Sequence, residues 1–375
     1  MLISYIIIFM IPFVDLHAQY LSIKSDIDKA LENCIADSNF IKGKAVSDFE
    51  KAFADWLGVE FCLGCGNGTD ALEIIMKSLN IGPGDEVIVP ALSWISTAET
   101  VNNVGAEPVF VDILHDTYTI DPAKIENKIT PRTKAIIPVH LYGCPADMDE
   151  IIRISEKHKI FIIEDCAQAH GAEYHGKKVG TFGIASAFSF FPSKNLGAYG
   201  DGGAIVTDNQ ELYEMTRMIS NHGQLKIKHK HTIIGRNSRL DSLQASILKA
   251  KLGYIDQWNF QRNQVAELYK NRLMVNKEIC LPVVPQNTKH VFHLFVVRCK
   301  KRDDMIKLLD ENNIAWAVHY PHPLPFLDAY AYKKHLPVDF PVSCTATEEV
   351  ISLPIYPELT ELQVNMICDQ IREKY

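Results

Sequence analysis

Lys194 lies between two kinds of sequence that can change the chemistry of an amine. It follows the aromatic run Phe188-Ser189-Phe190-Phe191 and precedes a glycine-rich stretch that ends in Gly202-Gly203. Poorly hydrated surroundings disfavour the charged form of a lysine and lower its pKa. The uncharged amine is the form that attacks a carbonyl group to make an imine. The pattern favours a reactive lysine, whereas most lysines are solvated surface residues.

Two carboxylates, Glu164 and Asp165, follow directly after the apolar residues 160–163. Burying a carboxylate is costly unless it finds a partner. A protonated pyridine nitrogen would be a fitting partner, and Gln168 lies close enough in the chain to meet a hydroxyl group on such a ring. The alternative is an aspartate that caps the next helix. These residues alone leave both interpretations open.

A glycine-rich segment, residues 64–68, leads through Thr69 into a helix expected over 71–79. Backbone N–H groups at a helix N-terminus, together with the helix dipole, attract anions, and the Thr69 hydroxyl adds a donor. The alternative is a turn in which Thr69 or Asp70 caps the helix. The segment lacks the Gly-Lys-Ser/Thr ending of the P-loop and does not match the dinucleotide-binding fingerprint.

The elements that must position these residues are short apolar runs rich in Val and Ile. They lack strict alternation, which is typical of strands buried on both faces. The runs are 85–92, 108–113, 134–141 and 159–166, and amphipathic segments such as 147–158 lie between them. This alternation predicts an α/β fold with a mostly parallel central sheet and helices on both faces. Ligands of such sheets bind outside the carboxyl ends of the strands, where the three motifs lie.

The length of 375 residues predicts one large and one small domain. Residues 241–273 read as two long helices, followed by a strand within 293–300 and a helix over 303–312. We therefore expect a large α/β domain over 10–250 and a small C-terminal α+β domain over 251–375.

Composition excludes several classes of protein. The net charge of −8, without a long basic block, argues against a nucleic-acid partner. Residues 1–9 are apolar but too short to span a bilayer and lack a signal-peptide pattern. We expect them to be a non-native or disordered extension before Met10, the alternative being a tail that touches a membrane.

Nine scattered cysteines predict reduced thiols in a cytoplasmic protein without a metal site. Cys62 and Cys65 are the only close pair. We interpret them as small buried residues, with a redox pair as the alternative.

Together these motifs resemble the DegT/DnrJ/EryC1/StrS sugar aminotransferases, which use pyridoxal 5′-phosphate (PLP) on the type I fold. The resemblance extends from Pro12-Phe13-Val14-Asp15-Leu16 to Leu353-Pro354. It implies that Lys194 binds PLP and shuttles a proton, that Asp165 pairs with the pyridine nitrogen, and that Gln168 lies near the ring oxygen. The other implied cofactor residues are Gly68, Thr69, Asp70 and Ser189 around the phosphate, and Trp94 stacked on the ring.

The resemblance also implies a homodimer with shared active sites. The segment 235–241 matches the part of the family that crosses the dimer interface. Asn237 would reach the phosphate in the partner's site and Arg239 would face substrate, the alternative being a helix cap with a surface charge. His319 and Tyr320 match a sugar-contacting turn, although His319 also reads as a packed core histidine. His222 is a further candidate for substrate binding. It precedes the basic stretch 226–231, which either meets a nucleotide diphosphate or is a solvated loop.

For the reaction, the resemblance implies transfer of an amino group from glutamate, leaving 2-oxoglutarate, to a nucleotide-linked 3-oxo sugar. The stretch 221–241, from Asn221-His222-Gly223-Gln224 to the Asn-Ser-Arg-Leu-Asp at its end, looks nearest to enzymes for UDP-2-acetamido-2-deoxy-3-oxo-hexose or -hexuronate in lipopolysaccharide and other polysaccharide biosynthesis. The dTDP enzymes differ from it at Asn221-His222-Gly223. Enzymes for dTDP-linked 3-oxo-6-deoxyhexoses have Asn-Tyr-Gly there and are one alternative. A PLP-dependent sugar dehydratase or a non-enzymatic regulator is another, but the dehydratases replace the lysine by histidine.

Overall fold

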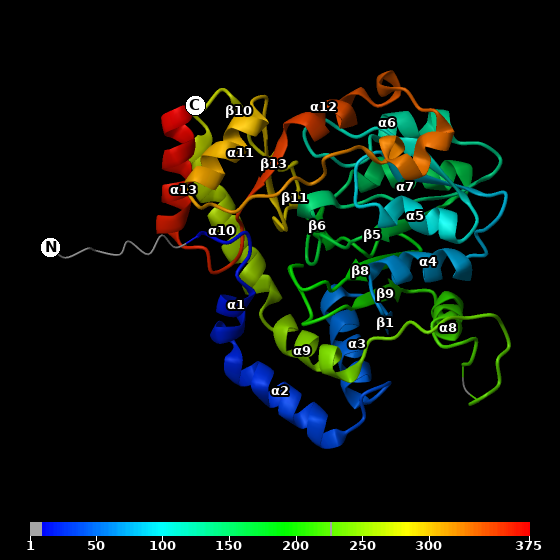
Figure 1. The fold of residues 1–375 in the computed structure, drawn as a ribbon. Helices are drawn as coiled ribbons and strands as arrows, with labels where there is room; N and C mark the ends of the chain where they lie inside the picture. Colours follow the sequence, from blue (N-terminus) through cyan, green and yellow to red (C-terminus); the bar gives the residue numbers. More distant parts are fainter. Residues whose placement is uncertain (1–9, 226) are drawn as a thin grey trace.

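The computed structural model describes residues 10–225 and 227–375. A seven-stranded sheet forms its centre, in the order β1-β9-β8-β5-β4-β2-β3 (Figure 1). The strands are β1 (Phe61–Cys65), β2 (Glu86–Pro90), β3 (Glu107–Val111), β4 (Thr133–Ile136), β5 (Phe161–Asp165), β8 (Ala185–Ser189) and β9 (Gly203–Thr207). Only β9 is antiparallel to its neighbours in this sheet. The predicted mostly parallel sheet is confirmed.

Helices cover both faces of this sheet, as the sequence predicts. On one face lie α3 (Lys44–Leu57), α7 (Met148–His158) and α9 (Ser242–Leu252). On the other lie α4 (Gly68–Ser78), α5 (Ser96–Asn103) and α8 (Gln210–Ile219). Successive strand residues point to opposite faces, so Ile88 packs in the first core and Val87 and Val89 pack in the second.

The strand predicted within 134–141 is shorter than expected, because β4 ends at Ile136. Pro138 has no N–H for the ladder. Beyond it, Val139 forms only an isolated bridge with Asp165, and the His140 N–H donates to the Asp165 carbonyl over 3.1 Å. This irregular segment runs beside the end of β5.

The C-terminal part packs to the left of the main sheet in Figure 1. Its core combines the long helix α10 (Ile255–Leu273) with an antiparallel sheet. That sheet has the order β10 (Ile279–Cys280), β12 (Phe295–Cys299), β13 (Val350–Leu353). Helices α11 (Arg302–Glu311), α12 (Pro341–Glu349) and α13 (Glu361–Lys374) complete it. The chain near its start also joins this part, because Ile11 bridges to Ile314.

The remaining elements are α1 (Leu16–Ser22), α2 (Lys24–Asp37) and α6 (Pro122–Ile125), with a small sheet of β6 (Glu173–Tyr174), β7 (Lys177–Lys178) and β11 (Thr288–Lys289). The domain boundary near residue 250 stays a prediction. Residues 1–9, expected to be an extension, and Lys226 lie outside the described residues.

No helix within the described ranges is long and apolar enough to cross a membrane. All nine cysteines are free thiols, and Cys62 and Cys65 are buried in β1.

Candidate active site

A cavity of about 610 Å³ lies beyond the carboxyl ends of the parallel strands. It collects side chains from the loops after β2, β5 and β8, from the start of α4 and from the C-terminal part. Most of the predicted site residues line it, namely Gly68, Thr69, Asp70, Trp94, Asp165, Gln168, Ser189, Lys194, His319 and Tyr320. Their convergence is the arrangement expected for a ligand site in an open parallel sheet.

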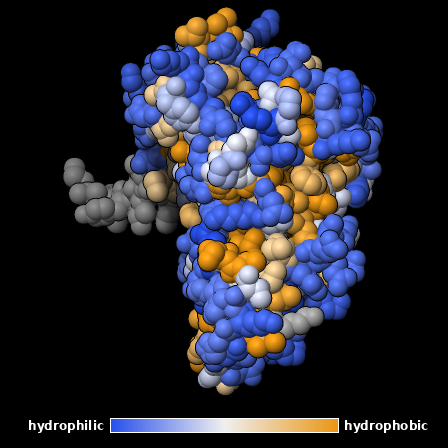
Figure 2. All heavy atoms as spheres, turned by 90° about the vertical axis from the view of Figure 1, so that its right-hand side faces the viewer, coloured by the Kyte–Doolittle hydropathy of each residue, from blue (hydrophilic) through white to orange (hydrophobic). Residues whose placement is uncertain are grey.

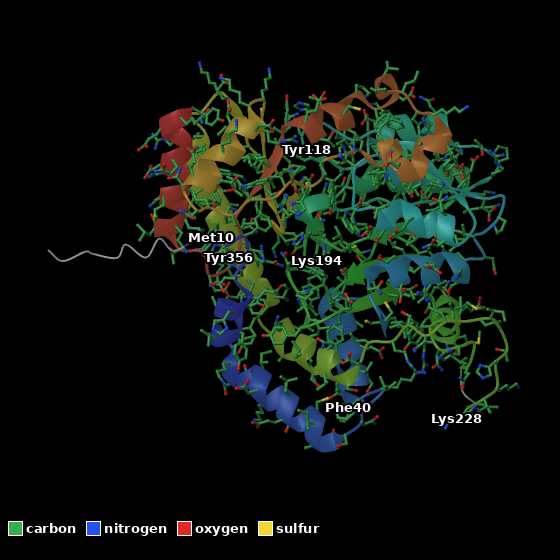
Figure 3. The ribbon with its side chains drawn as sticks, viewed as in Figure 1. Met10, Phe40, Tyr118, Lys194, Lys228 and Tyr356 are labelled. Atoms are coloured by element: carbon green, nitrogen blue, oxygen red, sulfur yellow. The ribbon has the colours of Figure 1, made fainter. Side chains whose placement is uncertain are left out.

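Lys194 occupies the turn after β8, near the middle of the molecule (Figure 3). The backbone N–H of Lys194 donates to the Phe191 carbonyl over 2.9 Å, and this bond fixes the turn. Burial lowers the pKa of the Lys194 amine to about 8, and the negative charge of Asp165 opposes this shift. A substantial fraction of the amine is therefore uncharged just above neutral pH, as a nucleophilic lysine requires.

Asp165 ends β5 with its carboxylate buried beneath the cavity. Its Oδ2 accepts a hydrogen bond from the Thr97 hydroxyl at 2.9 Å, and the Ala167 N–H donates to Oδ1 at 3.2 Å. Burial raises its pKa, while these hydrogen bonds and the charge of Lys194 oppose the rise. Within the described ranges, the Asp165 carboxylate makes no ion pair shorter than 4.0 Å, so it is available to a cationic ligand.

Two hydroxyl groups that support Asp165 were missed by the sequence analysis. Ser93 and Thr97 are hydrogen-bonded to each other at 2.8 Å, and Thr97 in turn holds Asp165. Both are buried. The available signal was their four-residue spacing where β2 passes into α5, which puts two hydroxyls on one side of a helix start.

Glu164 has a different role from its neighbour. Its carboxylate accepts the N–H groups of Gly180, Phe182 and Gly183 at 2.7–2.8 Å and faces His140 Nε2 at 3.0 Å. The Ala146 N–H donates to the other ring nitrogen of His140, so Nε2 carries the proton. Although Cys166 also lies within 4.8 Å, these donors occupy Glu164 and it anchors the loop before β8.

The start of α4 lines one part of the cavity and is the candidate anion site. Asn67 caps the helix by accepting the Asp70 N–H at 2.8 Å. A Cβ on Gly68 would lie 2.8 Å from the Cβ of Ser189, so only glycine lets the helix approach β8 this closely. The Thr69 hydroxyl is 2.7 Å from that of Ser96. Backbone N–H groups, the helix dipole and these hydroxyls converge on one point.

The Asp70 carboxylate, near this helix start, already has partners. It accepts a hydrogen bond from Ser238 at 2.6 Å and pairs with Arg236 at 2.5 Å. Arg236 thereby balances the negative charge of Asp70, which lessens its repulsion of an anion at the helix start. The Asp70 backbone N–H is also engaged, because it donates to Asn67, so a direct role of Asp70 in phosphate binding stays a prediction.

Gln168 and Tyr320 join the two parts of the chain across the cavity. The Gln168 side-chain oxygen accepts the Tyr142 N–H at 2.6 Å, and its amide donates to the Tyr320 hydroxyl at 3.0 Å. The Trp94 and Tyr320 rings lie 5.9 Å apart. His319 contacts Ser352 at 2.8 Å, and burial lowers its pKa to about 4, so its ring is neutral.

The structure does not bring three predicted residues, His222, Asn237 and Arg239, into the cavity of their own chain. Asn237 is exposed, while Arg236 and Ser238 on either side of it are tied to Asp70. The basic loop leads away from the cavity, and Lys228 lies far from Lys194 in Figure 3. The expected roles of Asn237 in a partner's site and of His222 and Arg239 in substrate binding stay predictions.

His293 lines the cavity and was also missed. In the sequence it starts the apolar run His-Leu-Phe-Val-Val, where a histidine is easily taken for a core residue.

PLP needs an anion site for its phosphate, an amine for its aldehyde and an acid for its ring nitrogen. The start of α4, Lys194 and Asp165 supply these three groups on the wall of one cavity. Gly68 lets the start of α4 approach Ser189 closely, and within the described ranges the Asp165 carboxylate has no paired cation. The residues present fit this cofactor.

Comparison with known proteins agrees with this geometry. Residues 21–372 match the DegT/DnrJ/EryC1/StrS aminotransferase family. The UDP-N-acetyl-3-dehydro-alpha-D-glucosamine 3-aminotransferase of Acidithiobacillus ferrooxidans is 44% identical over 96% of this chain and 97% of its own length. The dTDP-3-amino-3,4,6-trideoxy-alpha-D-glucose transaminase of Streptomyces venezuelae is 41% identical over 97% of this chain and 96% of its own length. A pleiotropic regulatory protein of Geobacillus stearothermophilus is 44% identical over 97% of this chain and 98% of its own length.

Solved structures show the same fold over nearly the whole chain. DesV of S. venezuelae, in complex with a ketimine intermediate, has a TM-score of 0.95 at 41% identity and covers 97% of this chain and 98% of its own. NtdA of Bacillus subtilis, with the bound cofactor PMP, has a TM-score of 0.86 at 32% identity. It covers 96% of this chain and 85% of its own. The chain therefore belongs to the DegT/DnrJ/EryC1/StrS aminotransferase family, with the fold of its PLP-dependent members.

Proposed function

We propose that this protein is a PLP-dependent aminotransferase that moves the amino group of glutamate to a nucleotide-linked 3-oxo sugar. The acceptor we favour is UDP-2-acetamido-2-deoxy-3-oxo-hexose or the corresponding hexuronate, in polysaccharide or lipopolysaccharide biosynthesis in the cytoplasm. The observation that carries the proposal is the position of the Lys194 amine and the Asp165 carboxylate on one cavity wall beyond the start of α4.

PLP, when bound, supplies a ring that stabilises negative charge on the reacting carbon. The protein's own residues supply the rest. The neutral Lys194 amine would hold the cofactor. It would also move the proton between the substrate carbon that bears the nitrogen and the cofactor carbon. Asp165 keeps a proton on the ring nitrogen, and Thr97 holds its carboxylate in place. The start of α4 fixes the phosphate, and Trp94 and Tyr320 confine the ring.

An intact lysine supports transamination over dehydration. A lysine amine can both form an imine and move a proton, whereas histidine can do only the second. The same residue, with its lowered pKa, argues against a regulator that binds no cofactor. The relatives named above include one protein for a UDP sugar, one for a dTDP sugar and one regulator. The choice of the UDP sugar rests on the Asn221-His222-Gly223 segment, and the dTDP-linked 3-oxo-6-deoxyhexose remains the second candidate.

The proposed reaction is tested with a panel of UDP- and dTDP-linked 3-oxo and 4-oxo sugars incubated with glutamate and PLP. We expect mass spectrometry to show an amino sugar and an equal amount of 2-oxoglutarate with the UDP-linked 2-acetamido-3-oxo sugar. Amination of a dTDP sugar alone would identify the second candidate. Absence of 2-oxoglutarate with every keto sugar would exclude an aminotransferase of this class.

A homodimer with shared sites is part of the proposal. Asn237 and Arg239 lie outside their own cavity, and large apolar side chains are exposed, among them Ile234 (97% exposed) and Phe40 (43% exposed). Figure 2 shows hydrophobic residues gathered on the face that lies to the right in Figure 1. Exposed apolar surface of this kind supports association with another protein surface.

Sharing of sites predicts complementation between two inactive variants. Lys194→Ala and Asn237→Ala/Arg239→Ala homodimers should both be strongly impaired. A heterodimer of the two, purified with different tags, should regain up to half of the wild-type activity, because one of its sites combines an intact Lys194 with an intact Asn237 and Arg239. If both residues act within their own chain, the heterodimer stays inactive, and that result would refute the shared site.

A further inference from the structure

His293 occupies a rigid position on the cavity wall, where the C-terminal part meets the main sheet. The backbone on either side of it is tied to the loop after β4. The Val291 N–H donates to Gly143 at 3.1 Å and the Leu294 N–H donates to Tyr142 at 3.3 Å. Arg262 donates to the Phe292 carbonyl at 3.2 Å. The imidazole, which is only 8% exposed, is therefore held in one place.

A chain of hydrogen bonds determines which ring nitrogen carries the proton. The His170 carbonyl can only accept, so the Asn259 amide nitrogen, 2.7 Å away, is the donor. The Asn259 side-chain oxygen must then accept from the Asn195 amide nitrogen at 2.8 Å. This same nitrogen also donates to the Val291 carbonyl at 3.0 Å. The remaining oxygen of Asn195 faces His293 Nδ1 at 3.2 Å, so Nδ1 is the protonated nitrogen.

The second ring nitrogen is consequently a hydrogen-bond acceptor. Burial, together with the nearby charges of Lys194 and Arg262, holds the pKa of His293 well below its usual value, so the ring stays neutral. Nε2 then bears a lone pair. No donor among the described residues bonds to it, and it is not among the fully buried unpaired atoms found there, so it remains accessible to the cavity.

We propose that His293 is a substrate-binding residue whose Nε2 accepts a hydrogen bond from a hydroxyl group of the bound sugar. This inference rests on the proposed function. A neutral acceptor cannot bind a keto oxygen or a phosphate oxygen, because both are acceptors as well. It requires an O–H or N–H donor. Glutamate has no hydroxyl group, and its amino group is the group that reacts, so His293 acts in the half-reaction with the sugar.

Two substitutions separate this role from a structural one. Asparagine places its amide where Nδ1 lies, keeps the contact with Asn195, and leaves the cavity side empty. Glutamine reaches the position of Nε2 and can present its carbonyl oxygen there. We expect His293→Asn to lower kcat/KM for UDP-2-acetamido-2-deoxy-3-oxo-glucose roughly 10- to 100-fold. The half-reaction with glutamate should stay within about twofold of wild type. His293→Gln should recover part of the loss.

A second measurement does not depend on catalysis. Nitrogen-15 NMR of the histidine rings in the cofactor-free protein should show His293 as a neutral ring protonated on Nδ1 at pH 7. A charged ring, or one protonated on Nε2, would overturn the inference.

The kinetic outcomes are equally decisive. A His293→Asn variant with an unchanged sugar half-reaction, or with equal losses in both half-reactions, overturns the role in sugar binding. If wild-type protein aminates no keto sugar, the proposed function fails and this inference with it. If wild type is active and only the His293 result is negative, the proposed function stands.

Discussion

Replacement of Lys194 by alanine is expected to abolish transamination, lowering the rate by at least ~10⁴-fold. No other lysine lines the cavity within the described ranges, so no second amine can hold the cofactor or move the proton. The measurement is 2-oxoglutarate formed from glutamate and the keto sugar. The visible band of bound PLP near ~410–430 nm should be lost as well.

Lys194→Arg is the matched control, because it keeps a positive charge opposite Asp165 but does not supply a neutral amine. It should be as inactive as the alanine variant while keeping a wild-type circular dichroism spectrum. Activity near wild type in either variant would contradict the assignment of Lys194.

The lowered pKa of Lys194 also predicts how cofactor capture depends on pH. The pKa of about 8 lies below the usual value for lysine. The neutral fraction therefore rises as the pH passes from 7 to 9, whereas an ordinary lysine would stay charged over this range. Capture of PLP by the cofactor-free protein, followed at 410–430 nm (an approximate range), should accelerate over the same interval.

The second large effect is expected for Asp165→Asn, which should lower kcat by roughly 10²- to 10³-fold. The amide keeps the shape of the carboxylate and can still bond to Thr97, but it has no negative charge to hold a proton on the ring nitrogen. Burial makes this charge effective, since little water surrounds Asp165 to screen it. The complete reaction should be measured at saturating glutamate and keto sugar.

Two neighbouring substitutions show whether the loss comes from the charge. Thr97→Val removes only the hydroxyl that holds Asp165 and should cost roughly 10-fold. Glu164→Gln should act on folding and lower the thermal midpoint, because Glu164 anchors three backbone N–H groups. An Asp165→Asn variant no slower than Thr97→Val would show that the charge of Asp165 is not needed.

Much of the fold could be predicted because its signals are local. The apolar run of β2 is buried at every position and those of β3 and β5 at most positions, and the sequence shows this as Val and Ile residues without strict alternation. The helix over Met148–His158 follows from its apolar spacing. The end of β4 was harder to predict, because it depends on Pro138 and on a single bridge between Val139 and Asp165.

Some residues of the candidate site could likewise be predicted from local patterns, and others could not. Lys194, Asp165 and Gly68 are recognisable because each follows or precedes an element with a clear pattern, and the rule for parallel sheets places them at one edge. Ser93, Thr97 and His293 were missed because their roles come from contacts with residues distant in the chain. The Thr97 hydroxyl meets a carboxylate 68 residues away, and His293 meets an amide 98 residues away.

The sequence by itself determined the class of fold and indicated Lys194 and Asp165 as candidate site residues, since these inferences depend on residue type and on the order of strands and helices. Only the tertiary structure decided the partners, the location and the hydrogen-bond polarity of individual side chains. It paired the Asp70 carboxylate with Arg236, left Asn237 outside the cavity of its own chain, and gave His293 a free acceptor nitrogen. Burial, charge neutralisation and hydrogen-bond polarity are properties of a residue's surroundings, and those surroundings exist only once distant segments have packed together.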